Sequence, residues 1–177
     1  MRTAIPRPFL AYYPAIVNQS DINETINFID RPDKITTFKT GHPPSYEELD
    51  TRDSYDPPSP KIYTCETKRM KMGDMVLGRS GDKGGNLNVG LFPKDHRHWP
   101  WLRSYMTKDR MRQLIGEDWH DSFFIERVEF VHINAVHFVI YGILGRGVSS
   151  SSRLDGFGKG FLDYIRDKHI DVPVEIL

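Results

Sequence analysis

A glycine-rich polar loop between two apolar runs most constrains what this chain can fold into. The loop reads GRSGDKGGNLN over residues 78–88, and the apolar runs are residues 75–77 before it and 89–92 after it. Glycine adopts backbone angles that other residues avoid, so this pattern predicts a sharp reversal between two antiparallel strands. Backbone N–H groups in such a turn, together with Arg79 and Lys83, can also point at one anion.

The glycine-rich loop therefore has two interpretations. In the functional one, Arg79 and Lys83 hold a phosphate or carboxylate. Asp82 then orients Lys83 or acts as a base, and Asn86 and Asn88 donate to a carbonyl oxygen. In the structural one, the loop is a tight hairpin whose Asp and Asn side chains bond their own backbone. A nucleotide loop is excluded, because the G-x-x-x-x-G-K-[ST] pattern is missing and a strand rather than a helix follows.

Composition and charge exclude several classes of protein. The 177 residues carry 24 Lys plus Arg and 24 Asp plus Glu, so no net charge attracts nucleic acid or an acidic membrane. Cys65 is the only cysteine, which excludes a disulfide scaffold, and its surroundings do not resemble those of a nucleophile. No apolar run reaches the roughly 20 residues of a membrane helix, and the first residues lack the apolar core of a secretory signal. We therefore expect a cytoplasmic protein.

The chain is expected to divide into three parts. Residues 1–30 hold an apolar piece that is too small to bury its own aromatic side chains, followed by a helix over residues 21–28 with Ser20 as its cap. Residues 31–60 carry six prolines and are expected to form an extended linker. Residues 61–177 are expected to form the folded domain.

Hydrophobic periodicity predicts an α+β fold for the domain, with one antiparallel sheet and helices on one face. The expected order is strand, strand, helix, strand, strand, helix, strand. The expected strands cover residues 62–67 or 74–78, 88–92, 123–132, 135–144 and 172–176. The expected helical segments begin at Pro100, cover residues 108–115 between the cap Thr107 and Gly116, and cover residues 155–168.

A pair of histidines flanks the junction of two predicted strands. His132 and His137 could lie near each other there, and a neutral histidine can act as an acid or base near pH 7. The alternative is a pair of half-buried structural histidines. No cluster of Cys or carboxylate residues supplies further ligands, so no metal site and no cofactor are predicted.

A serine-rich loop over residues 145–153 precedes the last predicted helix. Arg146 and Arg153 could strengthen an anion site at the start of that helix. The alternative is a flexible loop in which Asp155 caps the helix. No G-x-S-x-G elbow is present, which argues against a serine hydrolase.

Three stretches resemble one known family. RSGDKGGNLNVG, residues 79–90, resembles the signature RSGDKGxxxNIG of the AtuA-like ferredoxin-fold domain, the C-terminal domain of the acyclic terpene utilisation protein AtuA family. NAVHF from Asn134 and LGRGV from Leu144, the latter followed by SRLD and GK, resemble later stretches of that domain. Two positions differ, because the family often has Asp where Gly85 stands and Gly where Arg146 stands.

The resemblance covers about residues 70–168 and implies a ferredoxin-like antiparallel sheet. Residues 1–30 resemble the tail of the larger AtuA domain that precedes this sheet in the family, which makes them an N-terminal appendage or arm. By the same resemblance, the chain is a separately encoded C-terminal half, a truncated paralogue or a fragment.

The resemblance also implies a role in the breakdown of branched, terpene-like acids as CoA thioesters, or in secondary metabolism. The expected function is a small-molecule enzyme, or half of one, that binds a carboxylate or acyl-CoA. The alternative is a non-catalytic domain that completes a larger AtuA-type subunit or a homo-oligomer. The expected catalytic residues are Asp82, His137 and Asn88, and the expected substrate-binding residues are Arg79, Ser80, Lys83, Asn86, Asn134, Arg146 and Arg153.

Overall fold

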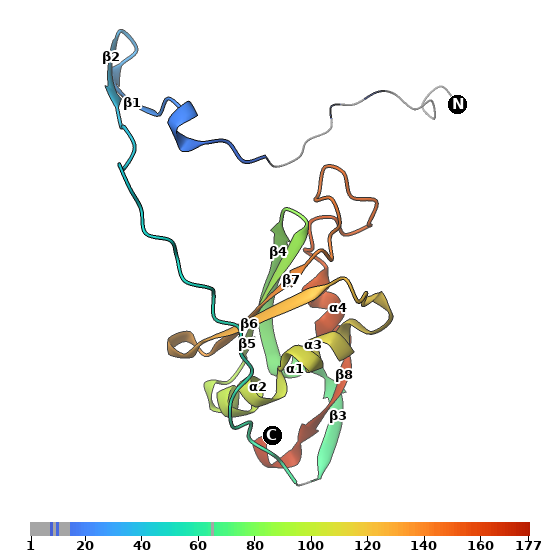
Figure 1. Cartoon of the computed structure of the whole chain (residues 1–177). Coiled ribbons are helices and arrows are strands. Elements are labelled where there is room, and N and C mark those ends of the chain that lie inside the picture. Colours follow the sequence, from blue (N-terminus) through green and yellow to red (C-terminus); the bar gives the residue numbers. More distant parts are fainter. Residues whose placement is uncertain (1–7, 9, 11–14, 65) are drawn as a thin grey trace. The chain divides into compact units, whose positions relative to one another are not determined.

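The computed structural model describes residues 8, 10, 15–64 and 66–177 (Figure 1). Cys65 and most of the apolar piece expected near the N-terminus lie outside the described residues. Contacts between residues divide the chain into two compact units, the smaller within Pro14–Arg52 and the larger containing Asp53–Leu177. The larger unit therefore includes the whole region that the sequence predicts to fold as a domain.

The smaller unit contains a β-hairpin, which corrects two expectations. Strand β1 (Thr25–Arg31) pairs antiparallel with β2 (Lys34–Lys39). The sequence instead predicted a helix over residues 21–28 and an extended linker from residue 31. The helical turn that the structure does contain in this region is the short 3-10 helix Gln19–Asp21.

Cross-strand contacts explain why the segment is a hairpin. Pro32 and Asp33 form the turn, and the Phe28 ring meets the Phe38 ring edge-on with centroids 5.7 Å apart. The spacing of the isoleucines suits a helix as well as a strand, and periodicity alone does not separate the two in a short apolar run. The partner strand that follows the Pro-Asp turn decides between them.

The larger unit is built on two antiparallel sheets. Strands β4 (Val76–Lys83), β5 (Asn86–Pro93), β6 (Phe124–Phe130) and β7 (Ala135–Tyr141) form a four-stranded sheet in the order β4-β5-β7-β6, and β3 (Thr67–Lys71) pairs with β8 (His169–Pro173). The glycine-rich loop is the β4–β5 hairpin, with Lys83 opposite Asn86. The predicted reversal is therefore confirmed.

Helices connect these strands (Figure 1). They are α1 (Met72–Met75), α2 (Trp99–Tyr105), α3 (Lys108–Ile115) and α4 (Phe161–Asp167), with 3-10 turns η3 (His96–His98), η4 (Gly116–Asp118), η5 (Val131–Ile133) and η6 (Val174–Ile176). Within the described part of the chain, none of the helices has the length and apolar character needed to cross a membrane.

Helix α3 matches its prediction at both ends. The Thr107 hydroxyl accepts a hydrogen bond from the Arg110 N–H at 3.1 Å, and the helix ends at Gly116, whose φ is 65°. Helix α2 carries Pro100 in its first turn, also as expected. These boundaries follow from local capping, so the sequence contains the information for them.

The last helix is shorter than predicted. Helix α4 begins at Phe161, whereas the sequence predicted a helix from residue 155. Both carboxylate oxygens of Asp155 accept backbone N–H bonds, from Lys159 at 3.0 Å and from Gly160 at 2.9 Å. Asp155 thus closes a turn ahead of the helix, and the positive φ of Gly158 (61°) prevents a helix from continuing through it.

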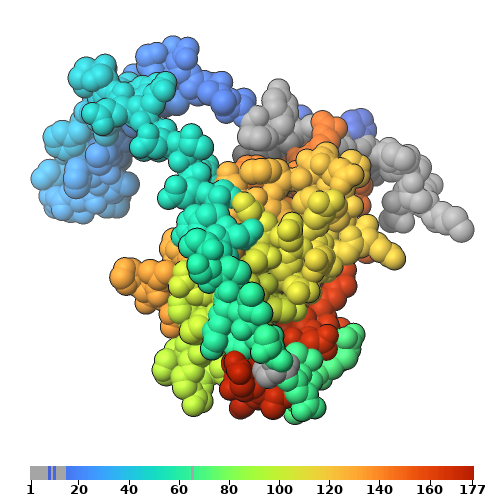
Figure 2. Space-filling model, turned by 60° about the horizontal axis from the view of Figure 1, so that its bottom comes forward, coloured from blue at the N-terminus to red at the C-terminus, as the bar shows by residue number. Residues whose placement is uncertain are grey.

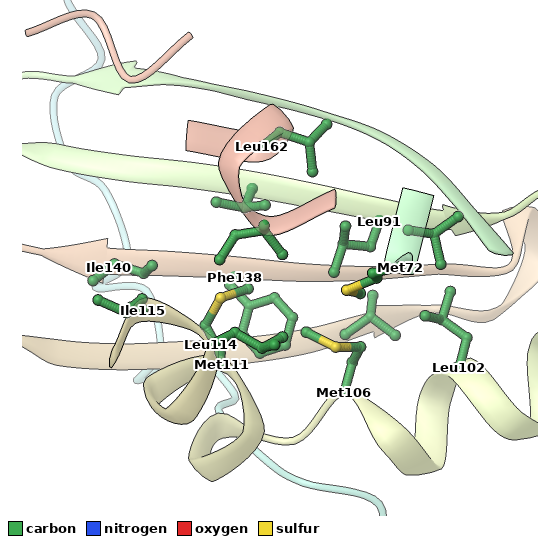
Figure 3. Close-up of a cluster of buried hydrophobic side chains, with 14 of the residues drawn as sticks. Met72, Leu91, Leu102, Met106, Met111, Leu114, Ile115, Phe138, Ile140 and Leu162 are labelled. Carbon is green, nitrogen blue, oxygen red and sulfur yellow. The ribbon is translucent and has the colours of Figure 1, made fainter. Parts of the chain in front are cut away.

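The hydrophobic core lies on one face of the four-stranded sheet. Leu87, Val89 and Leu91 of β5 alternate inward and stand opposite Ile140, Phe138 and Val136 of β7. Figure 3 shows side chains from α3 and α4 packed against this face, among them Met111, Ile115 and Leu162. The alternate residues point to the other side of the sheet, which we call the outer face.

One buried arginine ties the chain before β3 to the domain. The Arg127 side chain, on the core face of β6, is fully buried and donates to the carbonyl oxygens of Tyr55, Arg103 and Met106 at 2.7–2.8 Å. The Tyr55 N–H in turn donates to the Arg127 carbonyl oxygen at 3.0 Å. Figure 2 shows the segment after residue 53 lying against the helical side of the domain.

Candidate functional site

Six of the predicted site residues line one hollow on the outer face of the four-stranded sheet. They are Arg79, Ser80, Asp82, Lys83, Asn88 and His137, and Lys159 joins them from the loop before α4. The hollow has a volume of about 430 Å³. We call it the outer hollow.

Strand register explains why these side chains share one hollow. Arg79 stands opposite Gly90, and Gly90 in turn stands opposite His137. Because Gly90 has no side chain, the space between the arginine and the histidine stays open. Gly81 leaves a similar gap beside Asn88: a Cβ there would lie 3.5 Å from the Asn88 Oδ1 and 3.7 Å from the Lys159 Nζ. Two strand glycines therefore form the floor of the outer hollow.

The outer hollow carries an excess of positive charge. Arg79, Lys83 and Lys159 line it together with one carboxylate, Asp82. Among the described residues, none of these four charged groups has a hydrogen-bond or ion-pair partner. Charged donors without a partner are suited to an anionic ligand, which would gain charge-assisted hydrogen bonds from them.

His137 is the titratable group at the end of the outer hollow. It is half-buried, with the Phe130 ring edge-on to its imidazole at a centroid distance of 6.0 Å. Burial lowers its pKa, because the charged imidazolium loses hydration there. A neutral imidazole near pH 7 can accept a proton from a bound molecule.

The pH dependence of unfolding tests whether burial lowers the pKa of His137. The pKa of His137 in the folded chain lies below its ordinary value of 6.5, so the unfolded chain takes up the proton first as pH falls. Stability therefore declines below about pH 6.5 until the folded-state pKa is passed. We expect His137→Gln to reduce this decline in denaturant titrations at pH 5–8, and His132→Gln, an exposed control, to retain it. An equal loss of stability at low pH in the wild type and both variants would contradict a lowered pKa for His137.

The other histidine does not join this site. Across the β6–β7 pair, His137 stands opposite Val128, whereas His132 lies in the 3-10 turn η5, beyond the end of β6. The structure therefore does not bring the two histidines into register. In the described residues, no group of three His, Cys, Asp or Glu side chains is placed to hold a metal ion.

Three predicted ligand-binding residues, Ser80, Asn86 and Asn134, have structural roles, although Ser80 also lines the outer hollow. The Ser80 hydroxyl is buried, accepts from the Leu162 N–H at 3.1 Å and lies 3.4 Å from the Lys159 carbonyl oxygen, which joins β4 to α4. The Asn86 Oδ1 accepts from the Gly142 N–H at 3.0 Å. Asn134 adopts the left-handed conformation (φ 52°) at the entry to β7.

The two loop arginines lie away from the outer hollow. Arg146 is exposed between Gly145 and Gly147, both of positive φ. Arg153 lies over the Phe123 ring, 5.8 Å from its centroid, and lines a different cavity. The structure therefore does not combine Arg153 with Arg79 and Lys83 at one anion.

The serine-rich loop does contact the glycine-rich hairpin, but through the backbone. The Leu144 N–H donates to the Gly85 carbonyl oxygen at 3.0 Å, and a Cβ on Gly85 would overlap the Gly145 carbonyl oxygen. This close approach requires glycine at position 85 in this chain, where the family often has aspartate. Gly85 thus has a structural reason, whereas Arg79 and Lys83 form no hydrogen bond or ion pair with a described residue that would give them one.

Sequence reasoning missed one charged residue of the outer hollow, Lys159. Lys159 belongs to the GK pair that contributed to the family resemblance, but nothing in the spacing showed that its amine reaches Gly81 of β4. The reach depends on how the loop before α4 packs along the edge strand β4. That packing is a tertiary feature.

Comparison with known proteins agrees with the resemblance read from the motifs. Residues 70–171 match the sequence model of a family described as the AtuA ferredoxin-like domain. No curated protein and no solved structure matches the chain. The match confirms the predicted α+β, ferredoxin-like fold.

Proposed function

Because this chain belongs to the AtuA ferredoxin-like domain family, we propose that it is a small-molecule enzyme, or half of one, whose outer hollow binds the anionic group of its substrate. The substrate class is a branched or terpenoid carboxylate or its CoA thioester, used in catabolism or secondary metabolism in the cytoplasm. One observation carries the proposal: Arg79, Lys83 and Lys159 line one hollow, and none has a partner among the described residues.

Each polar group in the outer hollow has a role in this proposal. Arg79 and Lys83 hold the carboxylate or phosphate, and Lys159 adds a third positive charge. The Asn88 side-chain amide donates to a substrate carbonyl oxygen and polarises it. His137, neutral because burial lowers its pKa, accepts a proton, and Asp82 is the second candidate base.

Removal of the two strand cations tests the proposal. We expect Arg79→Ala with Lys83→Ala to abolish the thermal stabilisation given by terpenoid acids or acyl-CoAs. The melting temperature without ligand should stay unchanged, because neither side chain forms a hydrogen bond or ion pair with a described residue. Lys108→Ala with Arg112→Ala removes the same charge from α3 and should retain the stabilisation.

Two outcomes would contradict the proposal. One is that no carboxylate, phosphate or acyl-CoA stabilises the wild-type chain. The other is that the Arg79→Ala, Lys83→Ala variant unfolds or dissociates without any ligand effect. The second result would support a non-catalytic domain of a larger assembly instead.

Apolar side chains near the outer hollow support a further part of the proposal. On the outer face, Leu77 is 50 % exposed, Phe124 59 % and Phe130 50 %. Burying exposed apolar area of this kind favours association. We propose that a second copy or a larger AtuA-type subunit covers the face, which would exclude water from the outer hollow.

A further inference from the structure

A second cavity lies on the core side of the four-stranded sheet, where α3 and α4 approach each other. Its volume is about 510 Å³, which falls within the range of small-molecule sites. Leu87 of β5, Ile115 at the end of α3 and Tyr164 of α4 line it. We call it the helix-side cavity.

The interior of the helix-side cavity is apolar. Phe161 and Tyr164 line it with partly exposed rings, and Leu87, Ile115 and Leu144, which also line it, are almost fully buried. The Tyr164 hydroxyl is already occupied, since it donates to the Ile115 carbonyl oxygen at 3.1 Å and accepts from the Lys168 Nζ at 2.7 Å. The interior thus offers apolar contact and no free hydrogen-bonding group from the tyrosine.

An exposed leucine belongs to the rim of the same cavity. Leu154 lines it, yet its side chain is fully exposed to solvent. Exposing a leucine costs free energy that contact with an apolar molecule would recover. A ligand that fills the cavity could cover Leu154 as well as the residues of the interior.

Charged groups at the rim define which head group fits. The Arg153 guanidinium has no hydrogen-bond or ion-pair partner among the described residues, and its contact with the Phe123 ring leaves its N–H donors available. Asp155 forms no ion pair with Arg153, and its two carboxylate oxygens instead accept backbone N–H bonds from Lys159 and Gly160. Asp118 lines the rim too, but it is exposed and forms no ion pair with Arg153.

We propose that the helix-side cavity binds an amphipathic monocarboxylate, with its aliphatic chain on the apolar interior and its carboxylate on Arg153. Arginine suits this head group because its planar guanidinium donates two parallel hydrogen bonds to one carboxylate. This second site lies on the opposite side of the sheet from the outer hollow. It does not depend on the function proposed for that hollow.

Titration of the full chain with decanoate tests the second site. The experiment uses the Arg79→Ala, Lys83→Ala background, so that the outer hollow does not contribute. We expect decanoate to bind, and Arg153→Ala to weaken it about tenfold, the loss of one charge-assisted contact. Arg112→Ala, an exposed arginine of α3 outside the cavity, should leave the affinity unchanged.

Two probes of the same chain length test the charge assignment. Decanol should bind more weakly than decanoate, and decylamine more weakly still, because it meets Arg153 with a like charge. Asp118→Asn should leave decanoate binding equal or slightly tighter. Tighter binding of decylamine would assign the head-group role to Asp118 and overturn the proposal.

Methyl chemical shifts locate the bound chain independently of affinity. Decanoate should move the methyl resonances of Leu87, Ile115 and Leu144, and leave that of Val139, on the outer face, in place. No binding of decanoate, shifts confined to the outer face, or equal affinity of the Arg153→Ala variant would each refute the site.

Discussion

Replacing Arg127 by methionine is expected to lower the free energy of unfolding by about 3–5 kcal/mol, the usual cost of breaking a buried ion pair. The Arg127 guanidinium is fully buried and lies 2.8 Å from the Glu129 Oε1, whose side chain is 1 % exposed. Its removal leaves part of the Glu129 charge uncompensated, although Arg103 still contacts the other oxygen at 2.5 Å. Three backbone carbonyl oxygens also lose their donor.

Urea titration monitored by tryptophan fluorescence measures this loss. Arg112→Met is the matched control, because Arg112 pairs with Asp121 at 3.2 Å on an exposed surface, where ion pairs contribute little. The Arg127→Met, Glu129→Leu double variant should recover part of the stability, since no charge is then left buried alone. A loss no larger than that of Arg112→Met would show that the buried pair does not stabilise the fold.

Gly78→Ala is expected to have the next largest effect, a destabilisation of about 1–3 kcal/mol or more, as found for overpacked sites. A Cβ on Gly78 would overlap the carbonyl oxygen of Gly90 in the neighbouring strand and lie 3.2 Å from the Leu162 Cδ2. The obstacle is the backbone of the central strand β5, held on both sides by β4 and β7. The β5 backbone therefore cannot move away from the added methyl group.

Gly81→Ala provides the control within the same strand. A Cβ there meets its nearest neighbours at 3.5 and 3.7 Å, which is ordinary van der Waals contact. We expect the Gly81→Ala variant to unfold at nearly the wild-type denaturant concentration, while Gly78→Ala unfolds at a clearly lower one. Equal midpoints would mean that β4 and β5 adjust more freely than their packing indicates.

Local chemistry explains which elements were predictable. The α3 helix carries its own start and stop signals, Thr107 and Gly116, and the β4–β5 hairpin carries its turn glycines. Where a segment depends on a distant partner, the prediction was wrong. Residues 21–28 were assigned to a helix because the pairing with residues 34–39, which makes them a strand, is not visible in the local period.

Strand β6 shows a second limit of sequence patterns. The alternation of Phe124, Val128 and Phe130 correctly indicates a strand, but Phe124 and Phe130 lie on the exposed outer face. The core face of β6 instead carries Ile125 and Arg127. An alternation of apolar residues locates a strand but does not show which of its two faces is buried. That depends on which face of the sheet the helices cover.

The sequence by itself determined the family, the α+β class and the glycine-rich hairpin with its cations Arg79 and Lys83. These follow from residue order within one short segment, where turn geometry is local. Tertiary structure decided which charges act together. Strand register and the side-chain gaps at Gly81 and Gly90 place His137 and Lys159 in the outer hollow. The packing of α3 and α4 places Arg153 at a separate cavity.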